Sequence, residues 1–281
     1  MDIKFCSYQD HHFDELHNAF IDAFSSYFVS FSPDKETFHE RIYSKLNIAN
    51  ELSGVVMGNA RVVSFILHAL NTYQGKKTVY NGGTGTRINH RGSRLGFQLY
   101  EFLFGRIKES GAERILLEVI DKNKKALNLY ESLGFQFTRV LKCYKLKQEI
   151  TSDQAISIRT ADSWLPELSD NISFEPCFMD STEQLKHNLK NETILIAEKN
   201  NQTVGHLIFQ PKLGRISQLA IHPNHRSQGI GRSLLAECQR LSANSNLTLL
   251  NIPEAEIETI GALETLGFAN EIDQFELELV I

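Results

Sequence analysis

Apolar residues recur with helical spacing in two stretches of the chain. They are Leu95, Leu99, Leu103 and Ile107 in the first stretch, and Ile230, Leu234, Cys238 and Leu241 in the second. Residues at these intervals share one face of a helix, which predicts two amphipathic helices, each packed on a sheet. A short apolar run follows each helix, at Arg114–Ile120 and Leu247–Ile252, and these runs predict strands.

The pattern continues in the same order in both halves of the chain. A second predicted helix ends at Leu133-Gly134-Phe135 in the first half and at Leu266-Gly267-Phe268 in the second. Glycine directly after a helix supplies a left-handed cap. We expect a strand pair to close each half, with Val140–Lys147 and Phe275–Val280 as the last strands.

Apolar runs upstream of the first helix of each half predict further strands. They are Ile3–Ser7, Glu51–Met57 and Arg61–Tyr73 in the first half, and Ile156–Arg159, Thr193–Glu198 and Thr203–Phe209 in the second, with polar turns at Gly58-Asn59 and Asn200–Gln202. This order predicts an α+β fold in which helices flank a mixed, mostly antiparallel sheet. A chain of 281 residues suits two such domains, which we place at residues 1–148 and 155–281 around the polar linker Lys147–Gln154.

Composition and charge narrow the function classes. An apolar content of 42% and a charged content of 22% are typical of globular proteins, and the net charge of −5 gives no reason to expect nucleic acid or an anionic membrane as partner. The four cysteines have no C-x-x-C spacing, which indicates reduced thiols. No apolar run approaches the roughly 20 residues that span a bilayer, and the first ten residues do not resemble a secretory signal. We therefore expect a cytoplasmic protein.

A basic, glycine-containing segment opens the first helix in each half. It reads His90-Arg91-Gly92-Ser93-Arg94-Leu95-Gly96 in the first half and His225-Arg226-Ser227-Gln228-Gly229-Ile230-Gly231 in the second. The first N–H groups of a helix are unpaired and the helix dipole is positive there, so such a loop suits an anionic phosphate. The chain therefore contains two copies of one predicted anion-binding module.

The order of elements, with Arg-x-x-Gly-x-Gly opening the central helix, resembles the GCN5-related N-acetyltransferase (GNAT) superfamily over nearly the whole chain, twice. It is most similar to tandem members, of which mycothiol synthase is a known architecture. The resemblance implies two acyl-CoA N-acyltransferase folds and acetyl-CoA as cosubstrate, with its pyrophosphate on the loop and its pantetheine arm along the preceding strand. The cofactor-binding residues that it implies are Leu219, Ala220, Ile221, Arg226, Gln228, Gly229, Ile230, Gly231, Arg232 and Ser233 in the second half, and Arg91, Arg94, Gly96 and Asn123 in the first.

The two copies depart from the family pattern at different places. The second loop matches it in full: Gly229 lets the backbone approach a phosphate, and Gly231 allows tight helix packing. In the first loop Arg94 stands where the pattern has glycine, and its side chain either crowds the phosphate or supplies a cation. The run Gly82–Thr86 upstream is unusual for a strand, because glycine weakens pairing but lets a ligand or another backbone come close.

The catalytic residues of the family pattern are found in the first half. In this superfamily an asparagine often bonds the cofactor arm, and a tyrosine four residues before the Gly-Phe pair protonates the departing thiolate. Asn123 and Tyr130 match that pattern, two helical turns apart, whereas Glu256 and Leu263 hold the corresponding positions in the second half. The resemblance therefore implies that Tyr130 is the general acid.

Other candidates for the chemistry are open. The family attacks the thioester directly in a ternary complex, and its base often acts through water. Possible bases are Glu118 and His68 in the first half, and His206 and His222 in the second, each equally well explained as an ordinary structural residue. The ten histidines lack metal-ligand spacing, so no metal is expected. The aromatic stretch Phe20–Phe31 either covers the acceptor side or is buried in a core.

Three classes of function follow. The leading hypothesis is an acetyl-CoA-dependent N-acetyltransferase that acts on an amine of a small molecule or peptide. The half bearing Tyr130 and the half with the intact loop are nearly equal candidates for the chemistry. Because each half lacks part of the usual set, a non-catalytic module that binds CoA or acyl-CoA in one or both halves is the alternative. A structural pair that binds neither is a third, weaker class.

Overall fold

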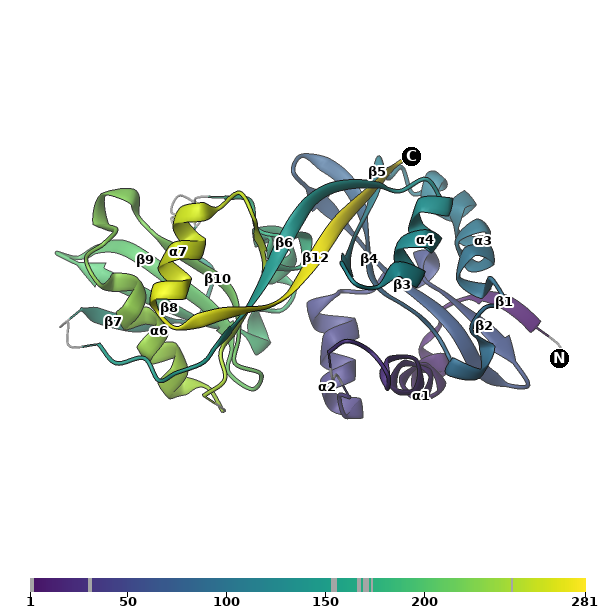
Figure 1. Cartoon of the computed structure of the whole chain (residues 1–281), viewed down its shortest axis with the longest axis horizontal. Coiled ribbons are helices and arrows are strands. Elements are labelled where there is room, and N and C mark those ends of the chain that lie inside the picture. Colours follow the sequence, from purple (N-terminus) through teal and green to yellow (C-terminus); the bar gives the residue numbers. More distant parts are fainter. Residues whose placement is uncertain are drawn as a thin grey trace. The chain divides into compact units, whose positions relative to one another are not determined.

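The chain forms two compact units (Figure 1). The computed structural model describes residues 3–29, 32–152, 156–165, 168, 172, 174–243 and 245–281. The first unit contains Met1–Thr138 and Phe275–Ile281, and the second contains Arg139–Gln274. This division differs from the expected boundary at residues 148–155, because the last seven residues of the chain belong to the first unit. Part of the expected linker, residues 153 and 154, lies outside the described residues.

The first unit has helices on both faces of one sheet. Its elements are β1 (Ile3–Ser7), α1 (Phe13–Phe24), α2 (Lys35–His39), β2 (Gly54–Gly58), β3 (Arg61–Tyr73), β4 (Lys76–Thr86), α3 (Leu95–Glu109), β5 (Arg114–Ile120), α4 (Lys124–Ser132), and parts of β6 (Gln136–Leu146) and β12 (Phe268–Val280). The strand order is β1-β2-β3-β4-β5-β12-β6. The pairs from β1 to β4 are antiparallel and β4–β5 is parallel, which confirms the mixed sheet expected from the sequence.

The apolar stripe of α3 forms the centre of the first unit's core. Leu99, Leu103 and Ile107 are fully buried and pack with β-strand residues and with α4. The opposite face of the sheet is covered by α1, where Phe20 packs on Phe65 of β3 with ring centroids 6.1 Å apart. The expected strand from Glu51 begins later, at Gly54, because residues 50–52 form a 3-10 turn.

The second unit repeats this arrangement. Its elements are β7 (Ser157–Ala161), α5 (Thr182–Lys186), β8 (Thr193–Lys199), β9 (Gln202–Gln210), β10 (Arg215–Ile221), α6 (Ile230–Leu241), β11 (Thr248–Pro253), α7 (Ile257–Thr265), and the remaining parts of β6 and β12. The order β7-β8-β9-β10-β11-β6-β12 mirrors that of the first unit. The core again joins the apolar stripe of the central helix, Leu234 and Cys238, to the sheet. No helix in the described parts of either unit is long and apolar enough to cross a membrane.

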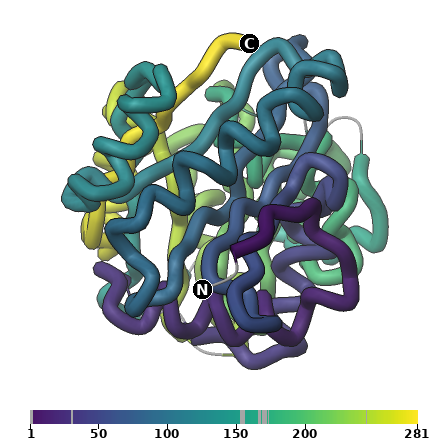
Figure 2. The backbone as a smooth tube through the Cα atoms, turned by 90° about the vertical axis from the view of Figure 1, so that its right-hand side faces the viewer, coloured from purple at the N-terminus to yellow at the C-terminus, as the bar shows by residue number. Residues whose placement is uncertain are grey.

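The expected strand pair at the end of each half is wrong. Each half ends instead in one long strand, β6 or β12, with residues in both units. The four residues 136–139 include no glycine, proline or asparagine, so nothing turns the chain there and β6 continues. In the first unit the Thr138 hydroxyl donates to the Glu276 carbonyl at 3.1 Å. Figure 2 shows the yellow C-terminal residues beside the blue-green first half, where the Ile281 N–H donates to the Glu113 carbonyl at 3.0 Å.

Candidate active site

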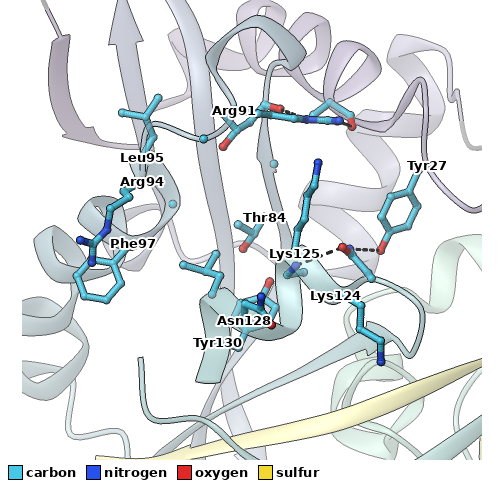
Figure 3. A pocket seen from close by; sticks show the side chains of 18 of the residues that line it. Tyr27, Thr84, Arg91, Arg94, Leu95, Phe97, Lys124, Lys125, Asn128 and Tyr130 are labelled. Carbon is cyan, nitrogen blue, oxygen red and sulfur yellow. Dashed lines mark hydrogen bonds between the residues drawn. The ribbon is translucent and has the colours of Figure 1, made fainter. Parts of the chain in front are cut away.

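A cavity of about 800 Å³ lies in the first unit, at the start of α3. Its walls are the loop before α3, the end of β4, the first turns of α4 and the segment that follows α1. Of the first-half residues expected from the sequence, Arg91, Arg94, Gly96, Asn123 and Tyr130 all line it. The structure therefore brings the predicted anion loop and the predicted catalytic helix into one cavity (Figure 3).

The backbone of the anion loop is nearly the same in both units. Two residues of each loop are left-handed: Gly92 and Arg94, with φ of 78° and 56°, and Ser227 and Gly229, with φ of 58° and 76°. Each loop therefore has glycine at only one of two strained positions. Arg94 adopts the conformation of the glycine that it replaces, so its backbone leaves the helix N-terminus open to an anion.

The side chains of the two loop arginines point away from the middle of the loop. The Arg94 guanidinium lies over the Phe97 ring, 4.8 Å from its centroid, so it lines the cavity without crowding it. Arg91 donates to the carbonyl oxygen of Ala23 at 2.6 Å and to the Thr86 carbonyl at 3.3 Å. Arg91 thereby ties the end of α1 to the loop and forms one rim of the cavity.

Asn123 caps α4 and contacts the opposite wall. Its Oδ1 accepts the Ala126 N–H at 3.2 Å, and its Nδ2 lies 3.5 Å from the Tyr27 hydroxyl. Tyr27 and Phe24 come from the aromatic stretch expected to be core or acceptor wall, and both line the cavity. Of that stretch Phe20 is core, Phe28 is 53% exposed, and residues 30 and 31 lie outside the described residues.

The end of α4 fixes the position of Tyr130. Gly134 is left-handed with φ of 92°, and its N–H donates to the Glu131 carbonyl at 3.0 Å. The Phe135 N–H donates to the Tyr130 carbonyl at 3.0 Å, and the two rings meet edge-on at 5.5 Å. These bonds complete a Schellman motif, so the Leu-Gly-Phe sequence holds Tyr130 against the core. Burial raises the pKa of Tyr130 to about 12, so its hydroxyl is protonated at neutral pH.

Lysines at the start of α4 add charge that the sequence analysis did not assign. Lys122, Lys124 and Lys125 line the cavity together with Arg91 and Arg94, and none of the described lining residues is acidic. Figure 3 shows Lys125 pointing toward Arg91, whereas Lys124 points away. Five cations around one cavity, in a chain of net charge −5, make a site suited to phosphate groups. The signal in the sequence was the three lysines at 122, 124 and 125, which flank Asn123 and precede Tyr130.

The second loop has its own set of contacts. Leu219, Ala220 and Ile221 lie on β10, as expected, and Ile230 to Ser233 form the first turn of α6. The Gln228 amide accepts from Lys199 at 2.9 Å. A Cβ at Gly231 would meet only Ile221, at 3.9 Å, so the expected packing reason for glycine at this position is wrong. Packing does favour glycine at Gly96 of the first loop, because a Cβ there would meet Leu129 at 3.2 Å.

The helix after β11 carries different chemistry from α4. Leu263 replaces Tyr130 and is 2% exposed in the core, and Glu256 caps α7 without a side-chain hydrogen bond. Glu258 replaces Lys125 and lies 3.9 Å from the Arg226 guanidinium. Arg232 is exposed at the start of α6. The second loop therefore keeps the backbone for an anion but faces a carboxylate where the first faces a lysine.

The candidate bases fall outside the cavity lining. Glu118 accepts a hydrogen bond from the Tyr80 hydroxyl. His68 is fully buried, with Nδ1 2.7 Å from the Leu52 carbonyl, and burial lowers its pKa to about 4. Burial likewise lowers the pKa of His206 to about 4. His222 caps a short turn by accepting the Asn224 N–H at 3.3 Å, which supports a structural role.

Gly82–Thr86 is explained mainly by packing. A Cβ at Gly82 would overlap Leu46, and one at Gly85 would overlap Phe65. These two glycines therefore leave room for Leu46 and Phe65, which are buried side chains of the first unit. Thr84 between these glycines lines the cavity.

Each unit is thus a helix-flanked sheet with an anion-binding loop at the start of its central helix, an arrangement that suits a phosphate-bearing acyl carrier. The Acetyltransferase (GNAT) family matches residues 8–135, and the Acetyltransferase (GNAT) domain matches residues 190–270. The chain belongs to the GNAT superfamily and contains two GNAT domains in tandem. No curated protein matches the chain.

Solved structures share this fold along the whole chain. A tandem GNAT protein from the clavulanic acid biosynthesis pathway is 12% identical with a TM-score of 0.76, and the match covers 99% of this chain and 98% of that one. A GCN5-related N-acetyltransferase from Sphaerobacter thermophilus is 13% identical with a TM-score of 0.73, covering 99% and 95%. At these identities the likeness establishes the fold.

Proposed function

We propose that the first unit is an acetyl-CoA-dependent N-acetyltransferase. In this proposal an amine of a small molecule or peptide attacks the thioester directly in a ternary complex. The observation that carries it is the cavity in which the α3 loop, five cations and Tyr130 meet. Family membership supports acyl transfer, and the cavity supports the first unit as its location.

The residues of the first unit have separable tasks in this reaction. The N–H groups that open α3, with Lys125 near them, bind the phosphate groups of acetyl-CoA, and the Arg94 guanidinium adds positive charge at the cavity wall. As the C–S bond breaks, its electron pair moves to sulfur and Tyr130 donates its proton there. The proton released by the acceptor nitrogen passes to water, which restores the Tyr130 hydroxyl. A proton donor positioned at the leaving atom contributes roughly 100- to 10,000-fold in rate.

For the second unit we propose a non-catalytic role. Its loop keeps the anion-binding backbone, but Leu263 has no proton to donate and Glu258 opposes a phosphate. The five cationic positions of the first cavity correspond to Arg226, Gly229, Ala255, Ile257 and Glu258. These five side chains have no net charge, so the second loop lacks the cation cluster of the first cavity and keeps Arg232 and Lys199 as further cations beside it.

Paired charge variants test the assignment. Lys125→Glu places a carboxylate in the first cavity, and Gly229→Glu places one at the second loop. Calorimetric titration with acetyl-CoA should show at least tenfold weaker binding for Lys125→Glu at the site that supports turnover. Gly229→Glu should leave thiol release against a panel of amines unchanged. If Gly229→Glu abolishes thiol release and Lys125→Glu does not, the chemistry belongs to the second unit.

A further inference from the structure

Four polar side chains lie together at the inner end of the first cavity. They are Asn81 and Thr84 of β4, Tyr100 of α3 and Tyr130 of α4. Asn81 is 5% exposed, Tyr100 is fully buried and Tyr130 is 6% exposed. Polar groups in such surroundings reduce stability unless they are hydrogen-bonded to one another, so a set of four requires an explanation.

The hydrogen bonds of Asn81 determine which atoms of this set donate and which accept. Its Oδ1 accepts the Gly83 N–H at 3.0 Å, which fixes the orientation of the amide. Its Nδ2 therefore points toward the Thr84 hydroxyl at 2.8 Å and the Tyr100 hydroxyl at 2.5 Å. An amide nitrogen only donates, so both hydroxyl oxygens accept from Asn81 and keep their own hydrogens for other partners.

Tyr130 is the member of the set that faces the cavity together with Thr84. Thr84 and Asn81 lower the pKa of Tyr130 against the larger raising effect of burial. An effect of this sense is expected from polar groups that stabilise the negative form of the phenol. The ring of Tyr100 supports that of Tyr130 edge-on, with centroids 6.3 Å apart.

The second unit supplies a control within the same chain. In the first unit Asn81 of β4 pairs with His68 of β3, and Gly83 pairs with Leu67. Gly82, between Asn81 and Gly83, is the extra residue of a β-bulge. In the second unit Ile216 of β10 pairs with Phe209 of β9, and Gln218 pairs with Ile208. Ser217 is therefore the extra residue of the corresponding bulge. The bulge aligns β4 with β10, and the starts of the helices align α3 with α6 and α4 with α7.

In this alignment every member of the polar set corresponds to an aliphatic residue of the second unit. Asn81, Thr84, Tyr100 and Tyr130 correspond to Ile216, Leu219, Leu235 and Leu263. All four aliphatic residues belong to or pack against the hydrophobic core of the second unit. The same fold therefore forms without the polar set. A buried network is stabilising only when complete, which explains why all four positions differ together.

We propose that Asn81, Thr84 and Tyr100 are positioning residues that hold the Tyr130 oxygen from behind, so that its proton points into the cavity. The proposal rests on the proposed function of the first unit. When the C–S bond breaks, the Tyr130 O–H bond breaks with it and an S–H bond forms. The negative charge left on the Tyr130 oxygen is then met by the Thr84 hydroxyl, which keeps its own hydrogen because its oxygen accepts from Asn81.

The first experiment measures the pKa of the phenol at position 130 and requires no turnover. 3,5-Difluorotyrosine is incorporated at position 130 of the full chain, because its phenol titrates where the protein is folded and can be followed by absorbance. Thr84→Val removes one donor at nearly constant volume and should raise the pKa of this phenol. Thr84→Ser should restore it, and Thr72→Val, at an exposed residue of β3, should leave it unchanged. An unaltered pKa in Thr84→Val overturns the proposal.

The second experiment measures thiol release from acetyl-CoA with an aliphatic diamine, an amino sugar and a short peptide as acceptors. Thr84→Val should lower kcat by about tenfold or more with little change in the KM for acetyl-CoA, because a hydrogen bond to a charged oxygen is lost. Thr84→Ser should recover most of this loss. A rise in KM at constant kcat would assign Thr84 to binding and overturn the positioning role.

The two experiments separate the proposals. If no acceptor gives turnover while the fluorotyrosine pKa moves as expected, the positioning network stands and the transferase assignment fails. If turnover occurs and neither measurement responds to Thr84→Val, the reverse holds. A fourfold variant with isoleucine at Asn81 and leucine at Thr84, Tyr100 and Tyr130 should keep the thermal midpoint and acetyl-CoA binding while losing turnover. Loss of folding in that variant would show that the set is structural.

Discussion

Leu277→Ala tests whether the end of the chain completes the first unit. Leu277 is 3% exposed and packs in the same core as the α3 stripe and Tyr130. Val280 lies three residues further along β12 and is 74% exposed. The two truncations therefore remove side chains from one strand, but only Leu277 leaves a cavity in a core.

The magnitude follows from this difference in burial. Removing a buried leucine side chain costs about 2–5 kcal/mol, whereas an exposed truncation changes stability by less than about 0.5 kcal/mol. A loss of about 3 kcal/mol lowers the midpoint of a domain of this size by roughly 10 °C. Since domains are stable by about 5–15 kcal/mol, the first unit should open locally well before the second.

Hydrogen exchange read by mass spectrometry locates the effect. In Leu277→Ala, peptides from β3, β4 and α3 should exchange faster, while peptides from β8 and β9 should keep their protection. Val280→Ala should resemble the parent chain in both units. Lost protection in β8 and β9, with β3 and β4 unaffected, would refute the assignment of the C-terminal residues to the first unit. Equal effects of the two variants would refute the burial argument.

Three further predictions concern single residues. Tyr130→Phe should lower kcat at least tenfold at unchanged acetyl-CoA affinity, because only the proton donor is removed; unchanged turnover would exclude Tyr130 from the reaction. Gly134→Ala should destabilise the chain to urea by about 1 kcal/mol or more, because φ is 92°, while Gly105→Ala in the open interior of α3 should stabilise it by about 0.5–1 kcal/mol. His206 has a pKa near 4 when folded and 6.5 as its ordinary value, so the folded chain binds fewer protons between these pH values. The stability contributed by neutral His206 is present above pH 6.5 and falls by up to about 1.4 kcal/mol per pH unit toward pH 4, and His206→Leu should flatten that slope in urea unfolding.

Locally encoded features were predictable from the sequence. The apolar stripe of α3, the strand at Arg114–Ile120 and the glycine cap at Gly134 are confirmed within a residue or two. Each depends on neighbours in sequence, through helical spacing, a short apolar run or a left-handed turn. Arg94, Asn123 and Tyr130 line one cavity, because the fold fixes the ends of α3 and α4, and their roles stay a prediction.

Features that depend on distant pairing were not predictable. The sequence predicts a strand at Phe275–Val280 but does not identify the strand beside it, so the place of Phe275–Ile281 in the first unit was missed. Tyr27 lines the cavity beside the end of α1, which Arg91 holds through a contact across more than sixty residues. The role of Arg94 was open for a similar reason, since its φ and its contact with Phe97 are tertiary facts.

The two repeats share a fold but differ in the side chains that they carry at corresponding positions. The first carries a cavity lined by five cations and a buried, hydrogen-bonded polar set. The second has aliphatic residues at the polar positions and a buried ion pair, with Asp180 bound by both ends of the Arg215 guanidinium at 2.7 and 2.8 Å. Because Phe275–Ile281 completes the first unit's sheet, the second repeat is required even if it transfers no acyl group. Its chain delivers the strand that the chemically equipped repeat lacks.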